Sequence, residues 1–475
     1  MRTGRSSRTW RGLGMRIFDL IIVGSGSAGI SAAETARERG TRSVAIVDSA
    51  KRLGGECPNR GCVPTKALLR STEILSLARR AGEFGLRIPR ADFQLRNIMK
   101  RKVRITDALT GGGRIEGVLK RLGVEVIRGT ASFVSPGSIA VGNKRYGAKR
   151  FIVATGSEAV IPPIPGLQES GYLTSEGIVT LKRLPKSIII IGGGPIGVES
   201  AQILSELGVR VTIVEFAAHL LPREDDDIAD IVSSAFQKRG MIVFTATQAV
   251  RVEKKNGGRR VVVEIGIEKK RKTLAAEAVL VAIGKRPVIT PLKPEKAGIE
   301  VDKRGRPKLN EFLQTSNPAV YVAGDAAGQM LFTHVAHEQG ILAATNAVGG
   351  DTVTSDLRIV PRGTFISPEV GSVGMTETEA RAAGVRVGVG SAAYATLGKA
   401  LVSGETDGLV KIIADMDSGL ILGGHVVGAA AAEIVHEIAL AMFADVPYAT
   451  VAKMIHAYPT YAEGIGAAAY NVQAL

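Results

Sequence analysis

The chain has only two cysteines and one tryptophan among its 475 residues, and aromatic side chains make up 4% of it. Two cysteines are too few for the disulfide framework of a small secreted domain, and the sequence around them supplies no ligand set for a structural zinc ion. No stretch of about 18 apolar residues lacks a charge or a helix breaker, so no membrane span is expected. These absences indicate a large globular protein whose two thiols have a role other than a structural disulfide.

Negative charge is also scarce, and the formal net charge is +16. Basic runs such as residues 268–273 (EKKRKT) have no interleaved aromatic side chains, so solvated turns explain them better than nucleic-acid binding. Residues 1–14 contain four arginines, no acid and the tryptophan. They lack an apolar run and adjacent arginines, so no signal peptide is expected. We expect residues 1–16 to be a basic flexible tail, or the natural start to be Met15.

Glycine, in contrast, is abundant, with 57 residues, and part of it marks an internal repeat. Residues 18–48 and 187–215 share an apolar strand, a G-x-G-x-x-G turn, a helix of small residues, a second strand and a terminal acid. In such units the first glycine permits the tight turn, the second lets backbone approach a pyrophosphate, and the third lets the helix lie close on the sheet. The helix N-terminus then presents free N–H groups to the phosphates. The glycines concerned are Gly24, Gly26 and Gly29 in the first unit and Gly192, Gly194 and Gly197 in the second.

Two such units predict two bound dinucleotides. Asp48 and Glu215 close them, where a carboxylate can accept both ribose hydroxyls. Glu215 would repel a 2′-phosphate, and the residues directly after it (FAAH) include no arginine that could bind one. The second site is therefore expected to prefer NAD(H), with NADP(H) less favoured. Arg223 lies farther on and leaves the question open.

Three more strand ends fit this arrangement. Residues 151–166 and 279–288 each end a strand in a turn of small residues and glycine, as chain crossing between domains requires. Residues 315–328 end a strand at Gly324 and Asp325, and an acid there can hold a sugar or ribityl hydroxyl, although it could equally cap a helix. The predicted cofactor residues in the first two stretches are Ala154, Thr155, Gly156 and Gly284.

The two cysteines, Cys57 and Cys62, directly follow the first unit and should lie near its ligand, next to the predicted cofactor glycines Gly54 and Gly55. Pro64 and the pattern that follows predict a helix from about Cys62. A helix N-terminus stabilises a thiolate, and Lys66 adds positive charge one turn on. The first turn brings a residue five positions back within disulfide reach. A redox-active pair is therefore predicted, against the alternative of two inert buried cysteines.

Together with the two dinucleotide units, the motif GGECPNRGCVPTKALL (residues 54–69) resembles the flavoprotein disulfide reductases. That family includes dihydrolipoamide dehydrogenase, glutathione reductase and mercuric reductase, and the resemblance runs from about residue 17 to the C-terminus. It implies an α/β protein with two Rossmann-like domains, one for FAD and one for NAD(P)H, plus an α+β C-terminal dimerisation domain. The expected divisions are 17–160 with 287–350 for FAD, 161–286 for NAD(H), and 351–475 for dimerisation.

The resemblance also implies a mechanism. Electrons would pass from NADH through FAD to a Cys57–Cys62 disulfide, with Cys62 facing the flavin and Cys57 attacking the substrate. Lys66 and Glu199 match the ion pair that the family places beside the flavin, and Asp325 would hold the ribityl chain. Pro195 stands where some members carry an aromatic lid, so no such lid is expected. The segment expected to run past the flavin ring is Thr333, His334, Val335 and Ala336.

The C-terminal segment, residues 454–471, departs from the family members that use thiol substrates. Those members end in His-Pro-Thr, with a glutamate five residues after the histidine. The histidine reaches in from the partner subunit as general base, and the glutamate orients it. Here Glu463 is present but Tyr458 replaces the histidine, and a phenol with a pKa of about 10 is a poor base at neutral pH. His456 is a candidate substitute base, and Tyr458 could instead simply pack at the dimer interface.

This chain resembles mercuric reductases in having a tyrosine, Tyr458, at that position. It also resembles them at residues 166–177, a stretch that would bring Tyr172 toward the disulfide. The chain nevertheless lacks their C-terminal cysteine pair, and Glu215 favours NADH. The leading hypothesis is a homodimeric FAD enzyme, NADH-dependent, that reduces a disulfide, a soft metal ion or a quinone. One alternative is a dihydrolipoamide dehydrogenase acting on a lipoyl group. The other is a basic binding or sensor protein that carries flavin. A reducible thiol pair without a signal peptide points to the cytoplasm.

Overall fold

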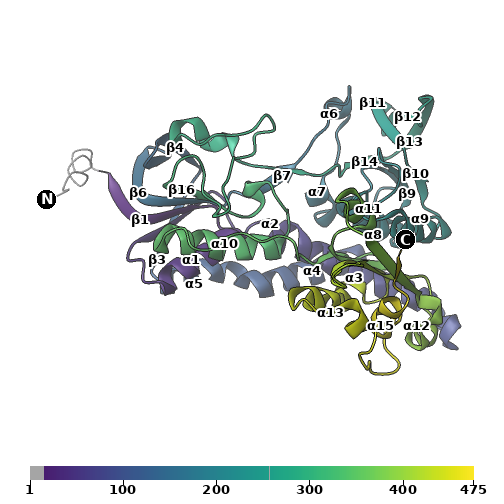
Figure 1. Cartoon of the computed structure of the whole chain (residues 1–475). Helices are drawn as coiled ribbons and strands as arrows, with labels where there is room; N and C mark the ends of the chain where they lie inside the picture. Colours follow the sequence, from purple (N-terminus) through teal and green to yellow (C-terminus); the bar gives the residue numbers. More distant parts are fainter. Residues whose placement is uncertain (1–14, 256, 475) are drawn as a thin grey trace. The chain divides into compact units, whose positions relative to one another are not determined.

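The computed structural model describes residues 15–255 and 257–474 (Figure 1). The predicted basic segment 1–14, with its tryptophan, lies outside the described residues. The described chain forms two compact units. Unit 1 consists of the residues up to Pro64, Val103–Ala159 and Lys285–Asp356; unit 2 consists of Thr65–Lys102, Val160–Gly284 and the residues from Leu357 on. The chain passes from one unit to the other five times: within the helices α3 (Cys62–Arg79) and α4 (Leu95–Thr110), and after Ala159, Gly284 and Asp356.

Unit 1 is built on a seven-stranded sheet in the order β3-β2-β1-β6-β5-β4, with β16 also paired to β6. The pairs among β1, β2, β3, β6 and β16 are parallel, whereas β4, β5 and β6 pair antiparallel. The strands of unit 1 are β1 Arg16–Val23, β2 Val44–Asp48, β3 Val124–Arg128, β4 Ala131–Ser135, β5 Ser138–Val141, β6 Lys144–Val153, β7 Ser157–Ala159, β15 Lys285–Pro287 and β16 Val320–Val322. Its helices are α1 Ser27–Glu38, α2 Glu56–Arg60, α5 Arg114–Arg121 and α10 Thr333–Gly349, with 3-10 turns η2 Gly111–Gly113, η3 Thr290–Leu292, η4 Pro294–Ala297 and η5 Gly324–Ala327.

Helices α1 and α10 lie side by side over one face of this sheet (Figure 1). Leu20 and Ile22 of β1 pack beneath them in one core cluster, while Ile21 and Val23 point into a second cluster on the opposite face. This alternation, with both faces buried, is typical of a parallel sheet covered on both sides. Gly340 allows the close approach of the helices, because a Cβ there would lie 2.3 Å from the Ala28 carbonyl oxygen.

Unit 2 contains a four-stranded parallel sheet, β10-β9-β8-β14, a three-stranded antiparallel sheet, β11-β12-β13, and a six-stranded antiparallel sheet, β17-β18-β21-β20-β19-β22. The strands of the first two are β8 Ser187–Ile191, β9 Arg210–Val214, β10 Ile242–Phe244, β11 Thr247–Lys255, β12 Gly258–Ile265, β13 Lys270–Ala276 and β14 Ala278–Val281. Those of the third are β17 Arg362–Thr364, β18 Glu369–Gly374, β19 Val387–Ala393, β20 Leu409–Asp415, β21 Ile421–Gly428 and β22 Gln473–Ala474.

The helices of unit 2 cover these sheets. They are α6 Leu167–Ser170, α7 Ser175–Val179, α8 Pro195–Glu206, α9 Asp226–Lys238, α11 Glu377–Ala382, α12 Gly398–Ser403, α13 Ala431–Phe443, α14 Tyr448–Val451 and α15 Glu463–Tyr470, with 3-10 turns η1 Ala81–Phe84 and η6 Tyr394–Thr396. Helices α13 and α15 pack on one face of the six-stranded sheet, in a core that includes Val410 and Val426. Its other face shares a core with α9 through Val370 and Val427.

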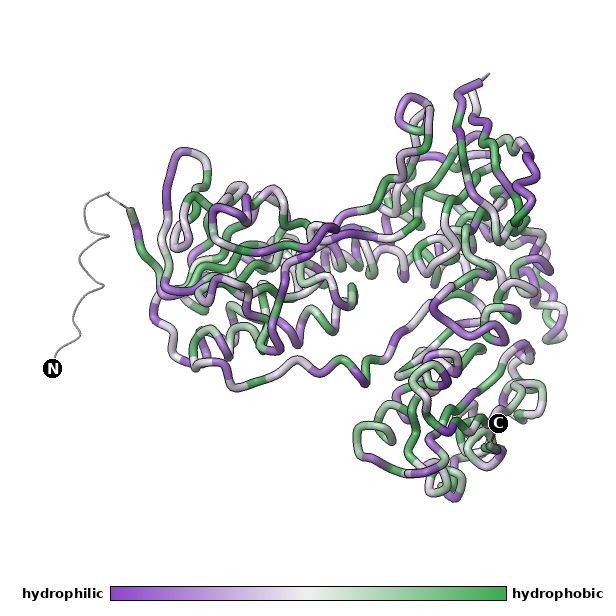
Figure 2. The backbone as a smooth tube through the Cα atoms, turned by 45° about the horizontal axis from the view of Figure 1, so that its top comes forward, coloured by the Kyte–Doolittle hydropathy of each residue, from purple (hydrophilic) through white to green (hydrophobic). Residues whose placement is uncertain are grey.

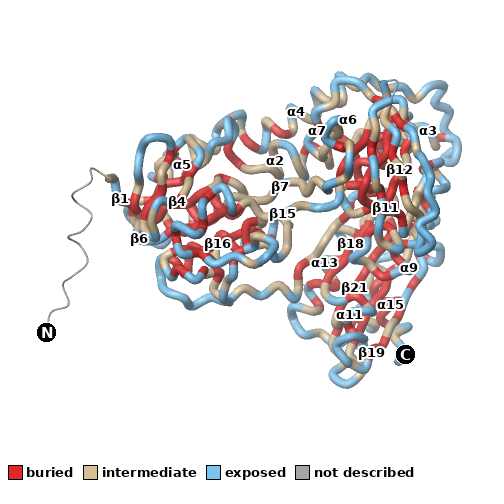
Figure 3. The backbone as a smooth tube through the Cα atoms, turned by 90° about the horizontal axis from the view of Figure 1, so that it is seen from above, coloured by how far each residue is buried: buried red, intermediate tan, exposed pale blue. Residues whose placement is uncertain are grey.

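Hydrophobic residues concentrate along the strands of both units and hydrophilic ones along the loops (Figure 2). Strands β18 and β21 are largely buried (Figure 3). The two Rossmann-like repeats and the α+β C-terminal region that the sequence predicted are confirmed. Within residues 15–255 and 257–474, no helix combines the length and the apolar character that crossing a bilayer requires.

Candidate cofactor and redox site

The two predicted repeats form β1–α1–β2 and β8–α8–β9, and their glycines play matching geometric roles. Gly24 and Gly192 turn the chain with φ of +107° and +110°. A Cβ at Gly29 would lie 1.9 Å from the Gly24 carbonyl oxygen, and one at Gly197 would lie 2.0 Å from that of Gly192. These glycines are therefore required by the turn and by close helix–strand packing, as the sequence pattern predicts.

The middle glycines, Gly26 and Gly194, face open space instead. A Cβ at Gly194 would meet no atom within 4 Å, and one at Gly26 would meet only the Gly55 Cα, at 3.8 Å, within that range. Both glycines are N-caps of their helices, α1 and α8, and neither helix has a capping side chain. The first N–H groups of each helix are thus left for a ligand, and both turns fit a pyrophosphate.

The terminal acids make the same contact in each repeat. The N–H of Ser25, directly after Gly24, donates to Asp48 Oδ2 at 2.8 Å. The N–H of Gly193, directly after Gly192, donates to Glu215 Oε2. Asp48 ends β2 and Glu215 follows β9, so each carboxylate stands at the carboxyl edge of its sheet beside the phosphate turn.

Gly54 and Gly55 lie against the first turn. Their φ values are +105° and +72°, and a Cβ at Gly55 would lie 2.6 Å from the Gly26 Cα. Only glycine allows this approach. The cysteine segment is thereby held beside the first phosphate turn, within unit 1.

Asp325 lies in η5, directly after β16, on the same unit. Burial raises the pKa of this carboxyl, and a hydrogen bond from the Ser157 hydroxyl and the positive charge of Lys285 oppose the rise. Lys285 Nζ is 2.6 Å from Glu56 Oε2. An acid, a hydroxyl and an ion pair therefore converge from four chain segments and offer both hydrogen-bond donors and acceptors to a polyhydroxyl chain.

Cys62 is the first residue of α3, where the sequence predicted a helix start, and this prediction is confirmed. Its Sγ is exposed and lies 3.6 Å from Thr333 Oγ1, at the start of α10. Cys57, in α2, is partly buried. Two helix N-termini, those of α3 and α10, therefore meet at Cys62, and both favour a thiolate there.

The rest of the segment predicted to run past the flavin forms the first turn of α10. Val335 and Ala336 have side chains buried in the protein itself, whereas His334 is exposed and stacks on Phe332 with ring centroids 5.5 Å apart. In the neighbouring turns, Thr155 Oγ1 donates to the Val288 carbonyl. The glycines of those turns, Gly156, Gly284 and Gly324, have φ of +74°, +118° and +70°.

Lys66 and Glu199 form the predicted ion pair within unit 2. Lys66 Nζ lies 2.8 Å from both carboxylate oxygens, and Glu199 is 5% exposed. The Phe365 N–H donates to Glu199 Oε1 at 3.0 Å, and the Phe365 ring lies 4.7 Å from Lys66 Nζ. A carboxylate this deeply buried is costly without partners, so the pair and the Phe365 N–H stabilise each other.

The C-terminal segment holds Tyr458 and Glu463, which the sequence grouped as the base position and the acid that would orient it. Tyr458 is 79% exposed, whereas Glu463 accepts a hydrogen bond from the Thr460 N–H at 2.9 Å. His456 Nε2 lies 2.8 Å from Glu437 Oε1 of α13, and its side chain is 9% exposed. His456 is therefore held inside the fold by burial and by Glu437, and its role as a candidate substitute base stays a prediction.

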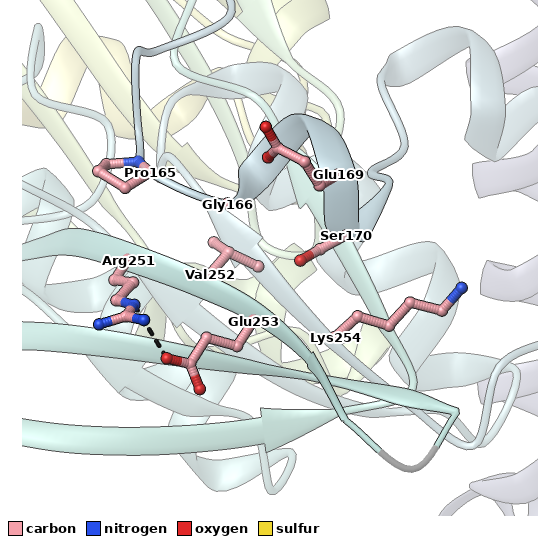
Figure 4. A pocket seen from close by; sticks show the side chains of 8 residues that line it. All are labelled: Pro165, Gly166, Glu169, Ser170, Arg251, Val252, Glu253 and Lys254. Atoms are coloured by element: carbon pink, nitrogen blue, oxygen red, sulfur yellow. Dashed lines mark ion pairs between the residues drawn. The ribbon is translucent and has the colours of Figure 1, made fainter.

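Tyr172 also lies in unit 2, between α6 and α7, half-buried against the core of β8, β11 and β14. A cavity of about 530 Å³ opens nearby between α6 and β11 (Figure 4). Its rim carries an Arg251–Glu253 ion pair at 2.9 Å, and it contains none of the predicted site residues. Among the described residues, no group of three or more His, Cys, Asp or Glu side chains could hold a metal ion.

Sequence reasoning missed four residues of this site: Glu56, Ser157, Lys285 and Phe365. Glu56 is adjacent to Cys57, Ser157 follows Gly156, and Lys285 follows Gly284, so position along the chain was a usable signal for all three. Phe365 gave none, because it contributes through Glu199, which is 166 residues away.

Comparisons with known proteins agree with this geometry. Residues 18–340 match the family Pyridine nucleotide-disulphide oxidoreductase, and residues 360–469 match its dimerisation domain. The chain is 37% identical to dihydrolipoyl dehydrogenase of Thermus scotoductus, over 96% of this chain and 97% of that protein. It is 34% identical to mercuric reductase of Bacillus cereus, over 94% of this chain and 70% of that protein.

Among solved structures, the Cu(II) complex of the HOCl-induced flavoprotein disulfide reductase RclA from Escherichia coli superposes with a TM-score of 0.85. It is 29% identical, and the match covers 96% of this chain and 99% of that one. Two phosphate turns, a cysteine pair at a helix start and a dimerisation domain all accord with these matches. The chain belongs to the pyridine nucleotide-disulphide oxidoreductase family, and it is an FAD-dependent enzyme that uses a pyridine nucleotide.

Proposed function

We propose that this enzyme takes electrons from NADH and delivers them to a disulfide, a soft metal ion or a quinone, in the manner of the mercuric-reductase branch of its family. Gly24, Gly26, Gly29 and Asp48 would hold FAD, and Asp325 would accept its ribityl hydroxyls. A bound flavin supplies the two-electron chemistry between a nicotinamide and a disulfide.

The remaining roles belong to side chains. Cys62, beside Thr333 at two helix starts, is the thiol kept as thiolate, and Cys57 is the one that attacks the acceptor. Lys66, held by Glu199, adds a fixed positive charge one turn along α3 from Cys62. Tyr172 and Tyr458 are proposed to assist an acceptor that needs no base.

The single observation that carries this proposal is the state of the C-terminal segment. An exposed phenol, Tyr458, stands at the position of the histidine base, and the neighbouring His456 is engaged by Glu437. A dithiol substrate needs a base to become a nucleophile, whereas Hg(II) or a quinone needs none.

The test compares two acceptors on the purified, FAD-loaded enzyme. We expect NADH to bleach the flavin and to drive Hg(II) reduction, while NAD reduction by dihydrolipoamide is slower by about 10²-fold or more. Dihydrolipoamide oxidation that is as fast as Hg(II) reduction would contradict the proposal.

The second candidate function is that of a dihydrolipoyl dehydrogenase. It is supported by the 37% identical Thermus protein of that name, whose length the match covers almost entirely. It also agrees with an NAD-type second site. The missing histidine is the observation against it.

A preference for NADH rests on Glu215, whose carboxylate is buried and held by the N–H groups of Gly193 and Ala217. A fixed negative charge at the ribose excludes a 2′-phosphate. Glu215→Ala is expected to raise kcat/KM for NADPH relative to NADH by about tenfold, which is about 1.4 kcal/mol. Steady-state kinetics with both nucleotides measure the ratio. Arg223→Ala is the control: a loss of NADPH use in that variant would mean that Arg223 recruits the 2′-phosphate.

The dimerisation domain supports a homodimer whose partner subunit completes the active site. Exposed apolar side chains on α13, on α15 and in the segment between them form a surface that a second copy would cover. They are Leu440, Phe443, Met454, Ile455, Tyr458 and Tyr470. A cytoplasmic location remains part of this proposal, since the thiol pair must be kept reducible.

A further inference from the structure

A row of buried polar side chains crosses the face of the six-stranded sheet that packs on α9. Ser372 on β18 pairs directly with His425 on β21, and His425 pairs with Lys411 on β20. They are 1%, 0% and 3% exposed. Val370 and Val427, on the same face, belong to an apolar core. Groups of this kind persist in a core only when partners satisfy them.

Glu224, just before α9, satisfies the first two members of the row. The Ser372 hydroxyl donates to Glu224 Oε2 at 2.6 Å, and His425 Nδ1 lies 3.2 Å from the same oxygen. His425 Nε2 lies 2.9 Å from the Met375 carbonyl oxygen. Both ring nitrogens therefore face acceptors, and His425 ties the sheet to the start of α9.

Lys411 pairs with three carboxylates. Its Nζ lies 2.9 Å from Glu377, 3.0 Å from Asp227 and 3.2 Å from Asp225. Burial would lower the pKa of Lys411, but its hydrogen bonds to Glu377 and Asp227 raise it. Burial would raise the pKa of Asp225, but the Glu377 N–H and the charge of Lys411 hold it below the ordinary value. Both shifts favour the charged forms of Lys411 and Asp225.

Segment 216–225 carries Glu224 and Asp225. It begins directly after Glu215, which contacts the second nucleotide turn at Gly193. Glu215 accepts hydrogen bonds from Gly193 and Ala217, and the Leu221 N–H donates to the Gly193 carbonyl at 2.9 Å. Leu220 is fully buried, and a Cβ at Gly193 would lie 2.5 Å from its Cδ2. One end of the segment therefore shapes the phosphate turn while the other end is bound to the buried row.

We propose that Lys411, His425 and Ser372 act as positioning residues for nucleotide binding: through Glu224 and Asp225 they fix segment 216–225, and thereby the alignment of Gly193 with Glu215. This rests on the proposed function to the extent that the second repeat is the NADH site. The row itself lies in the region matched to the dimerisation domain, which gives that region a role in the nucleotide site of its own chain.

The test uses the FAD-loaded enzyme with Lys411→Met, which keeps the length of the side chain but removes the buried cation that Asp225, Asp227 and Glu377 share. We expect KM for NADH to rise by about tenfold or more, with kcat at saturating NADH within about twofold of wild type. Lys411→Arg restores the charge and is expected to return KM most of the way. A general loss of stability would instead lower kcat and flavin content together.

Lys238→Met is the matched control. Lys238 lies on α9 and pairs with Asp407, next to β20, but this ion pair is exposed. The Lys238–Asp407 pair also joins α9 to the six-stranded sheet, but it contains no buried charge. The KM for NADH is therefore expected to stay unchanged in Lys238→Met.

Two further measurements keep the inference open to refutation. Glu224→Ala removes the contact of segment 216–225 with Ser372 and His425, and it should also raise the KM for NADH. It is the variant to use if Lys411→Met does not fold. Amide hydrogen exchange of residues 216–225 should be faster in either variant, whether or not NADH is the substrate. Unchanged exchange and unchanged KM in a folded variant would overturn the inference. Faster exchange in an enzyme that oxidises no NADH would refute the proposed function alone.

Discussion

Cys57→Ser is expected to lower NADH-driven acceptor reduction by about 10³-fold or more, while NADH still bleaches the flavin. A serine hydroxyl cannot form the disulfide with Cys62, so electrons that reach the flavin have no route onward. Stopped-flow reduction by NADH and steady-state turnover with Hg(II), a disulfide and a quinone separate the two half-reactions. Flavin content reports correct folding.

Cys62→Ser should stop turnover equally, and it should also change the visible spectrum of the flavin, because this thiol is the one proposed to face it. Arg70→Gln is the control, since Arg70 is exposed on the same helix and pairs with the exposed Glu73. A Cys57→Ser enzyme that retained a tenth of the wild-type rate with every acceptor would contradict the redox pair. The two thiols would then be inert residues.

Tyr458→His is expected to raise NAD reduction by dihydrolipoamide by about 10²-fold, because it restores a base whose pKa suits neutral pH. Glu463 lies five residues on, and one of its oxygens, Oε2, is held by the Thr460 N–H. In the family pattern a glutamate at this spacing orients the histidine base, and Glu463 is expected to do so for the new imidazole. The rate of NADH formation measures the gain, and Hg(II) reduction in the same variant shows whether the phenol mattered for metal ions.

Tyr458→Phe is the matched control, since it removes the hydroxyl without adding a base, and it should leave dihydrolipoamide oxidation as slow as before. His456→Gln tests whether the buried histidine contributes to dihydrolipoamide oxidation. A further fall in the dihydrolipoamide rate with that change would show that His456 is a base despite its contact with Glu437. No gain from Tyr458→His would mean that the acceptor cleft excludes a lipoyl thiol for reasons other than the base.

The fold was predictable where local rules decide it. A positive φ is required at Gly24 and Gly192, and there is no room for a Cβ at Gly29 and Gly197. Each repeat can therefore be recognised from about 30 residues of sequence. The start of α3 at Cys62 follows from local signals in the same way. The predicted domain divisions at 160, 286 and 350 remain predictions.

The site was less predictable where partners are distant in the chain. Phe365 supports Glu199 through a backbone N–H, and Lys285 reaches Glu56, contacts that depend on tertiary packing alone. The polar row of Ser372, His425 and Lys411 depends on the register of three strands, which no local pattern specifies. The contribution of Tyr172 to the acceptor site remains a prediction for the same reason.

The hydrogen bond from Gly193 to Glu215 has a consequence for the direction of turnover. It holds the acid that is proposed to bind the ribose in place before any nucleotide arrives, so the adenosine end would meet a site that is already ordered. NADH and NAD⁺ are identical at that end and differ only at the nicotinamide. Affinity gained there is therefore the same for substrate and product, and it favours neither. Whether electrons flow from the nucleotide or toward it is left to the relative potentials of the nicotinamide and the acceptor, and one unchanged site can serve both directions.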